Sequence, residues 1–125
     1  MTNQTQNSNE KKQYDLEERT ARFGENVLIL VGSISDNLIN RPLTSQLVRS
    51  ATSVGANYME ANGAESKKDF MHKIGICKKE AKETMHWLRM LATANPAKNQ
   101  ELQLLWQEVH ELVLIFSAIT KHKIN

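Results

Sequence analysis

Apolar residues recur at intervals of three and four along most of the chain, the spacing of one face of an α-helix. The first such segment predicts a helix over about residues 15–37, with acidic residues near its positive N-terminal end. Asn40-Arg41-Pro42 is expected to break the chain, with Pro42 as the first residue of the next helix. The inner stripe of the first helix is expected to comprise Leu16, Phe23, Val27, Leu30, Val31, Ile34 and Leu38.

A second helix is predicted over residues 42–62, closed by Asn62-Gly63 in the manner of a C-cap. Its middle, residues 50–56, is rich in small side chains, which indicates close approach of another backbone. Contact with a neighbouring helix is favoured there over a ligand-facing surface. The inner stripe is expected to comprise Leu43, Leu47, Ala51, Val54, Tyr58 and Ala61.

Two more helices complete the pattern. Ser66 to Asp69 resemble a capping box that opens a helix over residues 66–94, and Asn95-Pro96 should end it. The last helix is predicted over residues 98–120. No segment alternates with period two, so the fold class is all-α, an antiparallel up-down four-helix bundle. The third helix should bury Phe70, Ile74, Cys77, Ala81, Thr84, Leu88 and Leu91, and the fourth Leu102, Leu105, Val109, Leu112, Phe116 and Ile119.

Composition also predicts where the protein is located and how the chain divides into a tail and a folded domain. Residues 1–13 carry no apolar side chain after Met1, so we expect a disordered polar tail there and a bundle domain over residues 14–122. No signal peptide or membrane span is apparent, and one cysteine excludes an internal disulfide. A cytoplasmic protein without a membrane partner is expected.

Some apolar residues lie outside the predicted core stripes and leave a surface to be covered. Trp106 and Val113 form a second stripe on the fourth helix, and a monomer would leave part of this surface in water. Self-association is therefore expected, with Trp106 and Val113 at the interface. The surplus residues are Leu28, Ile29, Trp87, Met90, Leu104, Trp106 and Val113.

Charge is nearly balanced overall, at +2, but the third helix has seven basic residues against Asp69, Glu80 and Glu83. Several of its cationic residues share one face over roughly 30 Å, long enough to follow a phosphate backbone. The face lacks aromatic side chains for base stacking, and a simply solvated helix remains the alternative. We call Lys68, His72, Lys79, Lys82, His86 and Arg89 the basic stripe; Lys68, Lys79, Lys82 and Arg89 are its candidate nucleic-acid contacts.

Catalysis is not expected, because no spacing selects a set of reactive groups. Glu83 and His86 have the Glu-x-x-His spacing of a di-iron ligand pair, but the corresponding position before His110 is Gln107. Cys77 falls on the apolar stripe, where it would act as a small buried hydrophobe. We therefore expect a protein that is not an enzyme and holds no metal or cofactor.

Three segments together resemble a known family. They are Tyr14-Asp15-Leu16-Glu17-Glu18-Arg19-Thr20 with Phe23, QLVRSATSVGANYMEA (46–61) and SKKDFMHKIGICKKEAKETMHWL (66–88). They resemble the bacterial four-helix bundle proteins named after intervening sequences of 23S ribosomal RNA genes. His86 departs from this pattern, since many relatives carry an aromatic residue there.

The resemblance implies a small cytoplasmic homopentamer. Better-understood relatives are accessory proteins of diversity-generating retroelements, which bind nucleic acid and a reverse transcriptase. A scaffolding protein that contacts RNA or DNA is thus one expectation, and an oligomer that binds only a protein such as a reverse transcriptase is the other. Arg49 and Glu60, three turns apart in the family-like segment, are expected either to make polar contacts at a helix or subunit interface or only to be solvated.

Overall fold

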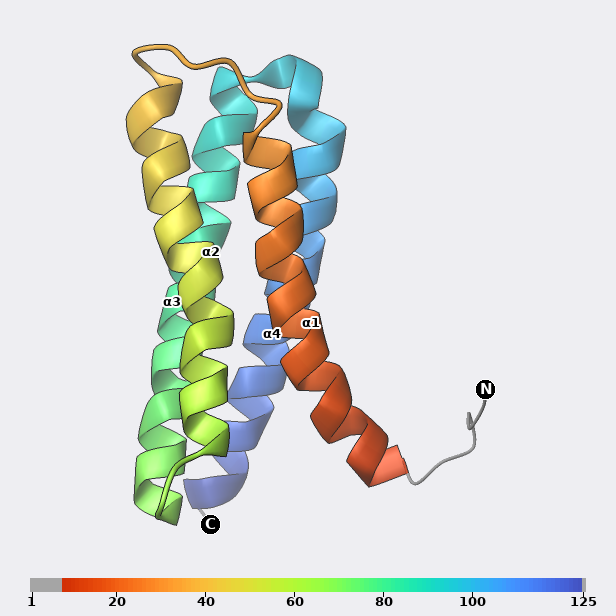
Figure 1. Ribbon diagram of the computed structural model, residues 1–125, viewed down its shortest axis with the longest axis vertical. Helices are drawn as coiled ribbons and strands as arrows, with labels where there is room; N and C mark the ends of the chain where they lie inside the picture. Colours follow the sequence, from red (N-terminus) through yellow and green to blue (C-terminus); the bar gives the residue numbers. More distant parts are fainter. Residues whose placement is uncertain (1–7, 125) are drawn as a thin grey trace.

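Four long helices follow one another along the chain and run alternately up and down (Figure 1). They are α1 (Ser8–Val31), α2 (Asn40–Asn62), α3 (Lys67–Ala94) and α4 (Asn99–Ile124), with a 3-10 turn, η1 (Pro96–Lys98), before α4. This computed structural model describes the backbone of residues 8–124 and the side chains of residues 16–121. The predicted all-α up-down four-helix bundle is confirmed.

Helix α1 begins and ends earlier than its periodicity predicts. It starts at Ser8, so residues 8–13 of the expected tail are helical, while residues 1–7 lie outside the described part. Glu, Lys and Gln in these turns have good helix propensity, and residues 8–13 include no Gly or Pro. The helix stops at Val31 because Gly32 and Ser33 follow. The apolar residues beyond them keep the helical spacing, which is why the sequence predicts a longer helix. Leu38, predicted to face the core, is 84% exposed.

The N-terminus of α2 also differs from the prediction. The helix begins at Asn40, two residues before Pro42, so the expected chain break lies earlier, in the loop after α1. The amide Oδ1 of Asn37 accepts the Asn40 N–H at 2.8 Å and thereby satisfies a donor of the first turn. Pro42 still lies in the first turn, where its missing N–H costs no helical hydrogen bond.

The predicted caps of the α2–α3 turn are largely confirmed. Asp69 N–H donates to Ser66 Oγ at 3.0 Å, as a capping box requires. Gly63 ends α2 by donating its N–H to Glu60 O at 3.1 Å, yet its φ of −94° is not left-handed. At the other end of the bundle, Asn95 caps α3 and Pro96 begins the 3-10 turn.

The core lies along the bundle axis, where the predicted stripes meet. The predicted stripe residues of α2, α3 and α4 are buried, except for Leu43, Phe70 and Ile119, which are half-buried. A Cβ at Gly55 would lie 3.4 Å from Thr20 O of α1, and one at Gly24 would meet Thr52 of α2. The small residues of α2 therefore serve a close helix–helix contact, as predicted.

Helix α4 is the most apolar of the four. By length and composition alone, Pro96–Lys121 could cross a membrane, since an 18-residue window within it has a mean hydropathy of 1.2. Its stripe from Leu102 to Phe116 is buried against the other helices, which is the ordinary position of a core helix in a bundle. Its outer side leaves Leu104 and Leu114 exposed.

Candidate nucleic-acid interface

The basic stripe is exposed along the outer side of α3. Its six residues, Lys68, His72, Lys79, Lys82, His86 and Arg89, are all exposed, and the core residues of α3 face the opposite side. The regular helix across Lys67–Ala94 holds the cations in one line because three- and four-residue spacings share a face. The structure thus brings the four candidate contacts, Lys68, Lys79, Lys82 and Arg89, onto one surface.

Two acidic residues beside the middle of the stripe, Glu80 and Glu83, are neutralised from another helix. Arg49 of α2 donates to Glu80 Oε1 at 3.3 Å and to Glu83 Oε1 at 2.7 Å. Among the described residues, no salt bridge involves Lys68, Lys79, Lys82 or Arg89. Arg49 thereby leaves the lysines as net positive charge on the surface of α3.

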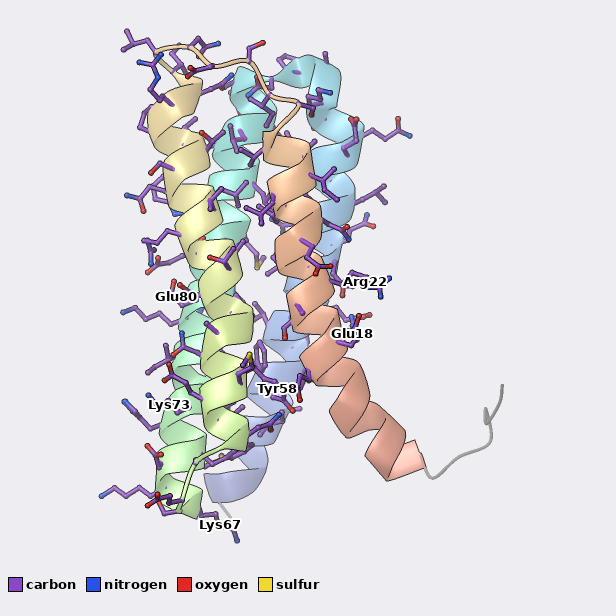
Figure 2. The ribbon with its side chains drawn as sticks, viewed as in Figure 1. Glu18, Arg22, Tyr58, Lys67, Lys73 and Glu80 are labelled. Carbon is purple, nitrogen blue, oxygen red and sulfur yellow. The ribbon has the colours of Figure 1, made fainter. Side chains whose placement is uncertain are left out.

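Glu60 makes a second ion pair across the same two helices. Lys73 Nζ donates to Glu60 Oε1 at 2.7 Å, and this contact raises the pKa of the Lys73 ammonium. Lys73 and Glu80 lie along the same side of the α2–α3 pair (Figure 2). Arg49 and Glu60 therefore both contact α3 within one chain.

A shallow hollow of about 390 Å³ lies within the basic surface. It is lined by Gly75, Lys78, Lys79, Lys82 and Glu83. Sequence reasoning omitted Lys78 and Gly75 from the interface. Lys78 lies at the border of the predicted stripe, and the adjacent pair Lys78-Lys79 was the signal that could have included it. The hollow gathers three lysines within two turns of helix.

A separate charged cluster joins α1 to α4. Arg19 donates through Nε and Nη2 to Glu108, at 3.1 and 3.0 Å, and through Nη2 to Glu111. The hydrogen bond to Glu108 is the main cause that raises the pKa of the Arg19 guanidinium, and burial opposes it. Because this two-point contact orients a planar guanidinium, it holds α1 and α4 together.

The apolar surplus is only partly at the surface. Val113 is 8% exposed and packs in the core of its own chain, so it is not part of an uncovered stripe. Trp106 is half-buried and stacks on His110, with ring centroids 5.0 Å apart. Ile29 and Leu104, by contrast, are 73% and 62% exposed and line one hollow between α1 and α4.

The residues with candidate reactive or metal-binding side chains are Cys77, Glu83 and His86. Cys77 is fully buried, and burial raises the pKa of its thiol to about 12, which leaves it protonated and unreactive at neutral pH. Glu83 binds Arg49, and His86 is exposed and contacts the edge of Trp87. Within the described residues, no group of three or more His, Cys, Asp or Glu side chains could hold a metal ion.

The comparisons with known proteins agree with the fold and the motifs. The family model of the 23S rRNA-intervening sequence protein matches residues 12–118. The chain belongs to this family. No curated protein matches the chain. The match includes part or all of each helix of this 23S rRNA-intervening sequence family member, and it includes the basic stripe and Arg49.

A solved structure supports the same assignment. It is the crystal structure of a protein of unknown function from the S23 ribosomal protein family of Bacteroides thetaiotaomicron VPI-5482. The two chains are 28% identical, with a TM-score of 0.73, over 84% of this chain and 97% of that one. The family member described here therefore shares nearly the complete length of that bundle.

Proposed function

We propose that this protein is a non-enzymatic accessory or scaffolding protein of the cytoplasm that binds the phosphate backbone of RNA or DNA. The outer surface of α3 makes the contact. The observation that carries this proposal is the row of cations that form no salt bridge among the described residues, since Arg49 holds Glu80 and Glu83, the two acids beside Lys79 and Lys82. The family's name refers to ribosomal RNA genes, which is consistent with a nucleic-acid partner.

The chemistry of the surface defines the mode of binding. Lysine ammonium groups act as point charges on phosphate oxygens and do not select a base sequence. The stripe follows α3 for roughly 30 Å, the length of the 22 helical residues from Lys68 to Arg89. We expect sequence-tolerant binding whose affinity falls steeply with added salt because counterions are released from the nucleic acid.

Self-association strengthens this contact. Four charges on one chain give weak binding at physiological salt, whereas several copies in one assembly raise the effective concentration of every further contact. We propose a homo-oligomer, a pentamer as in the family resemblance, in which each subunit presents its own stripe. No cofactor takes part in this function.

A filter-binding series in increasing salt tests the proposal. We expect the double variant Lys79→Glu, Lys82→Glu to bind duplex DNA and RNA at least tenfold more weakly than wild type, with a shallower salt dependence. The matched control is Lys121→Glu, a charge reversal at an exposed position on a different helix, α4. Equal binding by the double variant and wild type would leave the stripe as a solvated surface.

A second candidate function is supported by the apolar surface between α1 and α4. Exposed Ile29 and Leu104 fit an oligomer that binds a protein, such as a reverse transcriptase, without touching nucleic acid. Salt separates the two functions: binding through phosphates weakens strongly with salt, and binding through an apolar interface does not.

A further inference from the structure

We propose that Gly75 forms a notch in the centre of the basic stripe in which the sugar–phosphate backbone lies directly against α3. This inference rests on the proposed nucleic-acid function and adds a positioning residue to it. Gly75 lies two turns from both Lys68 and Lys82 and one turn from Lys79, so these charges surround it on the same face.

Nothing inside the chain explains a glycine at this position. Glycine in the interior of a helix disfavours folding relative to alanine. The other two mid-helix glycines, Gly24 and Gly55, lie in the close contact between α1 and α2. Among the described residues, a Cβ at Gly75 would meet no atom within 4 Å beyond the adjacent backbone of its own helix, and none of the chain's glycines has a positive φ. Packing and backbone conformation therefore both permit a larger residue.

The surroundings of Gly75 indicate what approaches it. Gly75 lines the same hollow as Lys78, Lys79 and Lys82, and the carboxylate at its edge, Glu83, is already bound by Arg49. A strand of phosphates matches this charge, whereas the apolar face of another protein helix would have to cover three lysines without a partner. Because Gly75 has no Cβ, the sugar–phosphate backbone can lie close to α3. Lysines on both sides can then reach its phosphate oxygens.

The test adds side-chain bulk at Gly75 without changing charge. The variants are Gly75→Ala and Gly75→Gln, and the matched control is Ala21→Gln, an exposed mid-helix position on α1. Binding to a 30-base-pair mixed-sequence DNA duplex and to the RNA duplex of the same sequence is measured by filter retention. Thermal unfolding and light scattering are recorded for each variant.

We expect affinity to fall in the order glycine, alanine, glutamine, with Gly75→Gln about tenfold weaker than wild type and Ala21→Gln unchanged. Thermal unfolding should move the opposite way, with a midpoint for Gly75→Ala about 4 °C above wild type. A loss of affinity in a more stable protein cannot come from misfolding.

Three results would overturn the inference, and each has a distinct meaning. Full affinity of Gly75→Gln, with weak binding by Lys79→Glu, Lys82→Glu, would refute the notch and retain the proposed function. Absence of binding by wild type at low salt would refute both. A changed oligomeric state of Gly75→Gln would assign the glycine to a contact between copies of the chain.

Discussion

At the scale of single residues, Arg49 has the largest influence on the charge of the candidate interface. Its guanidinium spans two carboxylates one turn apart on α3, and the side chain of Glu80 is only 13% exposed. A single exposed pair contributes less than about 1 kcal/mol. A partly buried carboxylate that loses its partner costs more, because it keeps the desolvation and loses the compensating hydrogen bond.

We therefore expect Arg49→Ala to lower the free energy of unfolding by more than about 1 kcal/mol. Denaturant titration measures this loss as a shift in the midpoint. Arg22→Ala is the control, because it breaks an exposed pair with Glu18 whose side chains are 66% and 65% exposed (Figure 2). An Arg49→Ala midpoint that moves no further than the Arg22→Ala midpoint would show that the two ion pairs only solvate the surface.

At the scale of elements, the sequence predicts the helices well and the connections poorly. The apolar period places the core stripe of α2, α3 and α4, and local signals such as Ser66 predict the first residues of α3. The end of α1 is mispredicted because Ile34 and Leu38 continue the period after Gly32. Apolar periodicity indicates which residues could share a helix face. Where a helix ends depends instead on local hydrogen bonds.

The candidate site follows the same division. The exposed cations of α3 were predictable, since a helix of known register fixes their face. The pairing of Arg49 with Glu80 and Glu83 was not, because it depends on how α2 and α3 align across 31 and 34 residues of sequence. The same reason hid the contact between Arg19 and Glu108.

A contact between connections also escaped prediction. Asn40 and Asn95 exchange two amide hydrogen bonds, at 3.0 and 2.9 Å, and Asn40 also donates to Ser35 O. Asn40 is 2% exposed, so its amide is removed from water and depends on these partners. The pair joins the first residue of α2 to the turn before α4 at one end of the bundle.

We predict that Asn40→Ala destabilises the protein by about 2 kcal/mol, because it leaves the amide of Asn95 without its buried partner. The chemical denaturation midpoint measures the loss. The double variant Asn40→Ala, Asn95→Ala should be less destabilised than the sum of the single variants, since both halves of one contact are removed. Strict additivity would contradict the importance of the pair. Asn26→Ala, at an exposed position of α1, is the control for loss of an asparagine.

At the scale of the whole molecule, the four helices present two different outer surfaces. One is the basic surface of α3, and the other is the apolar surface between α1 and α4. The N-terminal turns of α1 lean away from the bundle (Figure 1), while the apolar surface lies near the other end of this helix. Ile29 and Leu104 line a shallow hollow of about 410 Å³ on that side.

This arrangement favours Ile29 and Leu104, rather than Trp106 and Val113, as the expected oligomer contact. Because Val113 is buried and Trp106 packs on His110, neither offers a large free surface. Ile29 and Leu104 do, and an exposed apolar pair beside a hollow is typical of a protein contact. Self-association through this apolar surface would leave the lysines of α3 exposed and available to nucleic acid.

We predict that Ile29→Glu, Leu104→Glu shifts the assembly toward monomer, because two carboxylates would have to be buried without partners at the contact. Light scattering at micromolar concentration measures the mass of wild type and variant. The control is Leu38→Glu, since Leu38 is 84% exposed in the α1–α2 loop. Both positions of the variant are exposed in the single chain, so circular dichroism should show the bundle intact. A wild-type protein that is already monomeric at that concentration would refute the oligomer. An unchanged mass of the double variant would place the contact elsewhere on the bundle.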